Sequence, residues 1–316
     1  MIKRQHSLTQ DAQVDDDDAA LLPIRTVAAL TGIKTGTLRI WELRYHLLTP
    51  VRTDTGHRLY TQRDVAKLNE VQRLLDGGIS IGQVSAHLAE HKPSAAGLPA
   101  APHDNIDAQR IVMLDAVGRF DERELSNAYS NLLALYPLDI VTKRILMPML
   151  SQLGMRWAET AAGIAEEHFF SHFLRNKLGA QLHHREANPD GARLLLACLP
   201  RERHEIGLLL FANYLLDVGC RATVLGADLP LAETARVAQR GGFAGVVLSG
   251  SCDHSIDGEH DALRALVQSV AAPVFVGGAV AVRHAQAIQK CGAIAAGTDL
   301  RQGWAIIRER LSTSAD

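Results

Sequence analysis

The sequence predicts a multidomain protein of the α and α/β classes: a winged helix-turn-helix, a four-helix bundle and a Rossmann-like parallel-sheet domain, in that order. Three observations predict it. Helical apolar spacing with one turn-rich interruption fills residues 21–91, uninterrupted helical spacing fills residues 105–187, and short apolar runs alternate with amphipathic stretches in residues 190–316. The 316 residues suffice for three units, and a composition with 47% hydrophobic and 22% charged residues excludes collagen-like, coiled-coil and mostly disordered chains.

Two segments outside these units have compositions that form no core. Residues 1–20 are polar and contain an aspartate run from Asp15 to Asp18, which predicts a disordered acidic tail. Residues 92–104 are rich in proline, alanine and glycine and predict a linker. No apolar run reaches the roughly 18 residues of a membrane helix, and the N-terminus lacks a secretion signal. We therefore expect a cytoplasmic protein without a membrane partner. The cysteines form no C-x-x-C pair, which agrees with a reducing compartment.

Residues 24–42 have the spacing of a helix-turn-helix. A short helix is expected over Thr26–Leu30, and a second helix begins near Thr35. Gly32 lies between them and can adopt the backbone angles of the turn. The second helix is expected to enter the major groove of double-stranded DNA, with its first residues near bases or phosphates. Those residues are Lys34, Thr35, Thr37 and Arg39.

Positive charge is concentrated in the same region. Between residues 20 and 75 the chain has nine basic and four acidic side chains, and nine minus four is an excess of five on a chain whose net charge is −2. Such an excess suits phosphate contacts, for which Arg25 and Arg44 are further candidates. The alternative is a helical protein–protein domain with a solvated basic face. It does not explain the sequence motif at residues 55–60.

The sequence from Arg39 to Arg52, followed by Thr55-Gly-His-Arg-Leu-Tyr60, resembles the MerR family of transcription regulators. The resemblance implies that Arg58 and Tyr60 belong to a wing that grips the DNA backbone.

Four further positions bear on this resemblance. In the family, Trp41 and Tyr45 would anchor the recognition helix in the core. His46 stands where a helix-ending glycine is usual, and Leu43 where arginine is common. A non-glycine residue in a left-handed cap costs about 1 kcal/mol, so we expect the fold to survive. The arginine that Leu43 replaces is lost, and we expect this loss to weaken phosphate contact.

Residues 105–187 carry helical apolar spacing throughout. Ile111, Leu114 and Val117 share one face, for example, and Pro148 is expected to begin or kink a helix. The length fits a bundle of about four helices.

After Pro189, short apolar runs alternate with amphipathic stretches. This pattern predicts a parallel sheet covered on both faces, with ligands at the carboxyl ends of its strands. The runs are Leu194–Ala197, Ala222–Leu225, Gly245–Leu248 and Pro273–Val276, with residues 292–297 as a further edge strand.

His204 follows the first run, at the edge of the expected ligand crevice, where it could bind a metal. Glu202 can accept a hydrogen bond from the other ring nitrogen and fix the tautomer, and Gly207 lets the next helix approach a bulky ligand. An ordinary surface histidine is the alternative. A zinc site is disfavoured because no cysteine–histidine cluster has fitting spacing.

The Glu-x-His-x-x-Gly series continues at later strand ends, with Ser249 after the third run and Gly277-Gly278 after the fourth. Together these residues resemble the cobalamin-binding fold of methionine synthase and the base-off mutases. The resemblance implies that His204 is the lower cobalt ligand and that the serine and glycines line a slot for the displaced nucleotide tail.

The helical segment contains Trp157, nine further residues and then Glu167-His168. This spacing resembles the light-responsive, cobalamin-dependent MerR regulators (the CarH/LitR type). The resemblance implies that Trp157 covers the upper face of the cofactor and that Glu167 and His168 contact its 5′-deoxyadenosyl group. Ordinary roles in the bundle are the alternative for all three residues.

Three positions in these later segments depart from the family patterns. Glu202 stands where aspartate is usual, and Ser251 where leucine is usual. Ala158 follows the tryptophan where some light sensors have a histidine.

The combined resemblance implies a DNA-binding repressor, not an enzyme, that uses adenosylcobalamin as its light sensor. It implies a dark homotetramer that holds operator DNA and comes apart when light breaks the cobalt–carbon bond. One alternative is a regulator that senses cobalamin itself or has lost the ligand. Another is a corrinoid methyl-carrier or mutase-like enzyme, which the DNA-binding segment and the absence of a substrate barrel disfavour.

Overall fold

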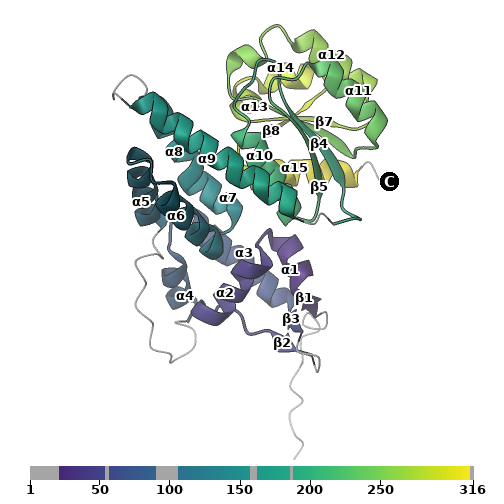
Figure 1. Ribbon diagram of the computed structural model, residues 1–316. Coiled ribbons are helices and arrows are strands. Elements are labelled where there is room, and N and C mark those ends of the chain that lie inside the picture. The colour runs from purple at the N-terminus through teal and green to yellow at the C-terminus, as the bar shows by residue number, and fades with distance from the viewer. Residues whose placement is uncertain (1–20, 54–56, 90–105, 157–161, 186–187, 314–316) are drawn as a thin grey trace, which may run out of the picture.

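The computed structural model describes residues 21–53, 57–89, 106–156, 162–185 and 188–313. The predicted tail (1–20) and linker (92–104) lie outside these residues, as do Trp157 and Ala158. Figure 1 shows the N-terminal part beneath a layer of helices, with the C-terminal sheet on the other side of the long helix α9. No helix in the described ranges is long and apolar enough to cross a membrane.

The N-terminal part is a small helical domain with a three-stranded antiparallel sheet of order β1-β3-β2. His46 ends the recognition helix α2 in the left-handed conformation, with φ of 50°, as the sequence predicts. Thr61 and Asp64 form a capping box at the start of α3. The elements are β1 (Leu22–Pro23), α1 (Ile24–Thr31), α2 (Thr35–Tyr45), β2 (Val51–Arg52), β3 (Arg58–Tyr60), α3 (Gln62–Asp76) and α4 (Ile81–Ala89).

A layer of helices follows and packs against both neighbouring parts (Figure 1). Pro148 lies in the first turn of α8, in agreement with the prediction that it begins or kinks a helix. The segment before α8 is a π-helix, which the sequence does not predict. The elements are α5 (Ile106–Gly118), α6 (Glu122–Leu135), α7 (Leu138–Val141), η3 (Thr142–Leu146), α8 (Met147–Met155) and α9 (Gly163–His184).

The C-terminal part contains a five-stranded parallel sheet of order β5-β4-β6-β7-β8. Apolar clusters cover both faces, with α10 and α15 on one side and α11, α12 and α14 on the other. The strands are β4 (Arg193–Cys198), β5 (Arg221–Gly226), β6 (Gly245–Ser249), β7 (Val274–Gly277) and β8 (Ile294–Gly297). The helices are α10 (Ile206–Asp217), α11 (Leu231–Gly241), η5 (Asp253–Ser255), α12 (His260–Ser269), α13 (Ala279–Arg283), α14 (Ala285–Lys290) and α15 (Leu300–Ser312).

The strand order has one reversal, and its position places the ligand crevice. The chain leaves β4 toward β5 at one edge and returns to β6 on the other side of β4. Loops after β4 and β6 therefore diverge and leave a crevice at their carboxyl ends. Glu202 and His204 lie in the first of these loops, and Ser251 and Cys252 lie in the second.

Candidate cofactor site and nucleic-acid interface

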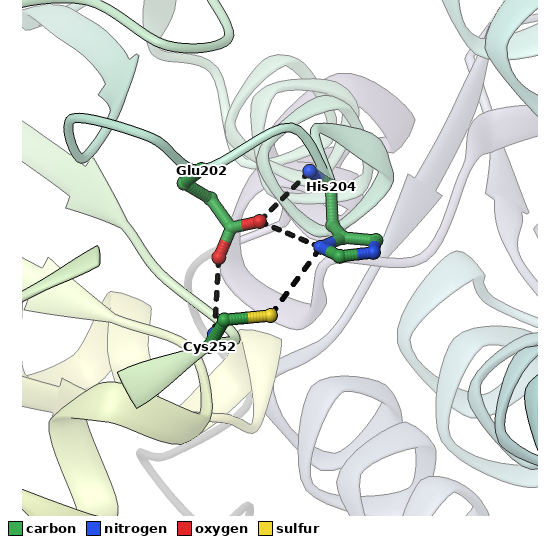
Figure 2. A group of neighbouring side chains, drawn as sticks. All are labelled: Glu202, His204 and Cys252. Atoms are coloured by element: carbon green, nitrogen blue, oxygen red, sulfur yellow. Dashed lines mark hydrogen bonds and ion pairs between the residues drawn. The ribbon is translucent and has the colours of Figure 1, made fainter. Parts of the chain in front are cut away.

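The imidazole of His204 is held by the carboxylate of Glu202, as the sequence predicts. Nδ1 of His204 lies 2.7 Å from Oε1 of Glu202, which also accepts the backbone N–H of His204 at 2.8 Å. Figure 2 shows both contacts. The Glu202 side chain is 1% exposed, whereas that of His204 is 68% exposed. The carboxylate is thus fixed inside the domain and presents the ring at its surface.

The other carboxylate oxygen of Glu202 anchors the loop after β6. Oε2 accepts the backbone N–H of Ser251 at 2.5 Å and of Cys252 at 3.1 Å, and the Ser251 hydroxyl at 2.8 Å. Burial by itself would raise the pKa of Glu202, but these N–H and O–H donors and those of His204 lower it to about 2. The residue is therefore an anion, which joins the two loops at the strand reversal.

This geometry decides which imidazole nitrogen can bind a metal. Because the ionised carboxylate of Glu202 can only accept a hydrogen bond, Nδ1 is the nitrogen that donates to it. In the neutral imidazole, Nε2 then carries the lone pair. Cys252 Sγ is 3.6 Å from the same Nδ1, so Glu202, His204 and Cys252 are close enough together to hold one metal ion. Both oxygens of Glu202 are, however, occupied by hydrogen-bond donors. The arrangement instead prepares Nε2 as a single ligand for a metal held elsewhere.

A cavity of about 890 Å³ lies between the helical layer and the carboxyl ends of the strands. It is near the upper end of the roughly 300–1,000 Å³ typical of ligand pockets. The sheet side contributes His204, and the helical side contributes apolar residues such as Met147 and Leu150. These lining residues suit a large, mostly apolar ligand whose metal ion can accept one ligand atom from the protein. The residues present therefore suit a corrinoid held by cobalt.

The predicted residues of α9 also line this cavity. Glu167 and His168 are both in its wall, and His172 lies one turn further along. Glu167 accepts a hydrogen bond from Ser171 at 2.5 Å, while the His168 side chain is 71% exposed. The third predicted residue of this group, Trp157, lies outside the described residues.

Ser249 and the predicted glycines Gly207, Gly277 and Gly278 line the cavity as well. A Cβ on Gly277 would meet no atom nearer than 3.6 Å, so a methyl group there would make only ordinary van der Waals contact. Gly278 has φ of 86°, and a Cβ there would collide with the carbonyl of Gly250. Gly278 is thus required by the close approach of two backbones.

The N-terminal domain carries a separate basic surface. A cavity of about 450 Å³ between β1, the wing and α2 is lined by Arg25, Arg39, Arg58 and His57. Glu42 of α2 accepts a hydrogen bond from Arg58 Nε at 2.6 Å and so ties the wing to the recognition helix. Arg39 and Arg44 are exposed on α2, and Thr35 is half-buried at its start. Guanidinium groups around a hollow of this kind suit DNA phosphates.

The structure places three of the predicted DNA-contact residues in buried or half-buried positions. Thr37 is only 2% exposed because its face of α2 packs toward α6, and Tyr60 is fully buried in the core instead of gripping the backbone. Lys34 is half-buried, and burial lowers its pKa while the nearby Asp217 opposes that effect. Lys34 therefore lies at the contact with the C-terminal domain.

Trp41 and Tyr45 are buried, as expected, but Trp41 does more than fill the core. Its indole Nε1 donates a hydrogen bond to the carbonyl of Leu135 at 2.8 Å, at the end of α6. The recognition helix is thus attached to the helical layer.

Sequence reasoning missed two features of the site. The backbone N–H groups of Ser251 and Cys252 bind Glu202, and no side-chain pattern signals a backbone donor. Arg175 of α9 donates to Glu205 at 2.6 Å, and both residues line the cavity. These two residues are far apart in the sequence, so only the fold pairs them.

Comparison with known proteins agrees with these sites. Residues 22–91 match the family described as MerR HTH family regulatory protein, and residues 112–180, in the helical layer, match the B12 binding domain family. The chain is 36% identical over 275 residues to the HTH-type transcriptional repressor CarH of Myxococcus xanthus, covering 83% of this chain and 90% of that protein.

The chain belongs to the CarH-type family of MerR repressors. It is also 30% identical to the HTH-type transcriptional repressor CarA of Myxococcus xanthus, over 86% of this chain and 91% of that one. Among solved structures, the Methanosarcina barkeri monomethylamine corrinoid protein matches with 20% identity and a TM-score of 0.49, over 62% of this chain and 95% of that chain. Membership of the CarH-type family confirms the prediction of a DNA-binding regulator and not an enzyme.

Proposed function

We propose that this CarH-type repressor binds adenosylcobalamin in the cavity between its helical layer and its parallel sheet, and uses it as a light sensor. The observation that carries the proposal is the imidazole of His204, whose orientation is fixed by a hydrogen bond to Glu202. Glu202 holds Nδ1 at 2.7 Å, so Nε2 is available as the lower ligand of cobalt. A surface histidine without a ligand has no need of a buried carboxylate that also joins a second loop.

The other site residues have assigned roles under this proposal. Ser249, Gly277 and Gly278 line the slot for the nucleotide tail, and Gly207 allows α10 to approach the corrin ring. Trp157, Glu167 and His168 contact the upper adenosyl group. When bound, the cofactor supplies a cobalt–carbon bond that visible light breaks. The chain's own part is to exclude water from the upper face and to register whether that face is filled.

The same geometry argues against a regulator that has lost its ligand. Glu202 still makes contacts to both loops of the crevice, although it is one methylene longer than the usual aspartate. The Ser251 hydroxyl, which replaces the usual leucine, binds Glu202 at 2.8 Å and so helps the longer side chain to reach its partners. The two departures from the family pattern, Glu202 and Ser251, are therefore hydrogen-bonded to each other.

We propose further that the dark form is a homotetramer that holds double-stranded operator DNA through several recognition helices. Linked sites raise overall affinity without new contacts, so dissociation of the tetramer releases the DNA. Arg25, Arg39, Arg44 and Arg58 contact phosphates or bases in this complex. Loss of the adenosyl group biases the switch between the two assemblies.

Size-exclusion chromatography with adenosylcobalamin, in the dark and after green light, tests the proposal. We expect a coloured dark oligomer that becomes smaller on illumination, and a His204→Ala variant that elutes colourless. An oligomer that forms with cobalamin but ignores light would instead assign the protein to cobalamin sensing. A wild-type chain that stays colourless would refute the cofactor itself.

A further inference from the structure

The π-helical segment η3 connects the cavity to the DNA-binding domain. It spans Thr142–Leu146, between α7 and α8. Short π-helical segments are rare and recur at functional sites, because the extra residue turns neighbouring side chains in new directions. Here Thr142 lines the cavity, while the next two residues, Lys143 and Arg144, reach the DNA-binding domain.

Thr142 lines the cavity and has a buried, unpartnered hydroxyl beside it. The residue is 5% exposed, and its hydroxyl has no hydrogen-bond partner among the described residues. A helical threonine commonly bonds the carbonyl four residues earlier, and this one does not. A buried polar group without a partner costs free energy, so such a group at a ligand cavity points to a partner on the ligand.

Lys143 joins all three parts of the molecule. Its Nζ is 2.7 Å from Oδ1 of Asp76, the last residue of α3 in the DNA-binding domain. It is also 3.9 Å from Oδ2 of Asp299, which lines the same cavity and caps α15. A shift of η3 would therefore alter the contact with α3 directly.

Arg144 strengthens the same connection. Its guanidinium lies against Gly78, in the turn that follows α3, and its Nη2 is 3.3 Å from Oδ2 of Asp107 at the start of α5. Two adjacent cations of η3 thus hold the end of α3.

We propose that Thr142 is a cofactor-binding residue, and that η3 transmits occupancy of the cavity to the DNA-binding domain through Lys143 and Arg144. The Thr142 hydroxyl binds a neutral polar group of the ligand: an amide on the corrin rim or a hydroxyl of the adenosyl group. Binding fixes the first residue of η3, and the following two residues fix the end of α3. This inference rests on the proposed function, because the ligand it invokes is the corrinoid.

The Thr142→Val variant tests the binding step, since valine has the same shape without the hydroxyl. We expect its affinity for adenosylcobalamin to fall about threefold to tenfold, as for one lost neutral hydrogen bond. We also expect the apo-protein to melt at an unchanged or higher temperature, because the variant removes an unpartnered buried group. Thr142→Ser, which keeps the hydroxyl, is the matched control and should retain the affinity.

Hydroxocobalamin, which lacks the adenosyl group, separates the two sources of the ligand contact. A loss of affinity for both compounds places the contact on the corrin rim, and a loss for adenosylcobalamin alone places it on the adenosyl group. Unchanged affinity for both, or a less stable apo-protein with unchanged affinity, overturns the proposal. A wild-type chain that binds neither compound refutes the proposed function instead.

Hydrogen exchange of α3 tests the transmission step. Adenosylcobalamin should slow amide exchange in residues 62–76 of the wild-type chain. In the Lys143→Met/Arg144→Met double variant we expect the cofactor to bind but this response to fall by at least half. Lys177→Met is the control, because Lys177 donates to Ser126 within the helical layer. An undiminished response in the double variant overturns the proposal.

Discussion

Replacing Glu202 by glutamine removes the charge that orders the crevice. The carboxylate has a pKa of about 2 in the folded protein, against an ordinary value of 4.5. At about 1.4 kcal/mol for each pH unit, this difference stabilises the folded state by about 3 kcal/mol at neutral pH. Because the folded pKa is the lower one, that stabilisation is complete above pH 4.5 and is lost as the pH falls toward 2.

The Glu202→Gln variant should therefore be less stable than wild type at pH 7 by up to about 3 kcal/mol, and the gap should close in acid. The amide also turns one acceptor into a donor that faces N–H groups, so cobalamin affinity should fall roughly 10- to 100-fold. The assay is urea unfolding of the apo-protein at several pH values, with cobalamin titration at pH 7. Glu233→Gln, which removes a carboxylate paired with Arg236 on the surface of α11 and away from the cavity, is the control. A stability gap that stays constant from pH 7 to pH 2 would refute the reasoning.

Three further predictions concern other parts of the chain. His46→Gly should raise the free energy of unfolding by about 0.5–1 kcal/mol in urea titrations, because glycine relieves the left-handed cap; lower stability would contradict it. Arg39→Ala should reduce the slope of log affinity against log salt for DNA by about 1, and an unchanged slope would exclude phosphate contact. Gly278→Ala should lower the melting temperature, whereas Gly277→Ala should not; equal effects would contradict the backbone collision.

The sequence predicted the parts of the fold that depend on local patterns. Continuous apolar runs followed by amphipathic stretches located the strands, and the loop after the first run located Glu202 and His204. Only Arg203 lies between these two residues in the chain, so their spacing alone suggested the hydrogen bond that the structure contains. The strained cap at His46 followed from a local departure as well.

Contacts between segments far apart in the chain could not be predicted from the sequence. Thr37 and Tyr60 were expected to reach DNA, but one packs toward α6 and the other fills the core. The helical pattern of α2 gives no sign of which face meets a second domain. The π-helix η3 was also unpredicted, because its residues have the same periodicity as an α-helix within the span of one turn.

The central claim is that the imidazole of His204 replaces the cofactor's own base below cobalt. Electron paramagnetic resonance of the chain loaded with the cobalt(II) form of cobalamin tests it most directly, because a nitrogen ligand splits the cobalt lines. With nitrogen-15 in histidine only, we predict that each triplet becomes a doublet, and that His204→Ala loses this pattern. Triplets that persist in the labelled protein would show a nitrogen from outside histidine and would contradict the claim.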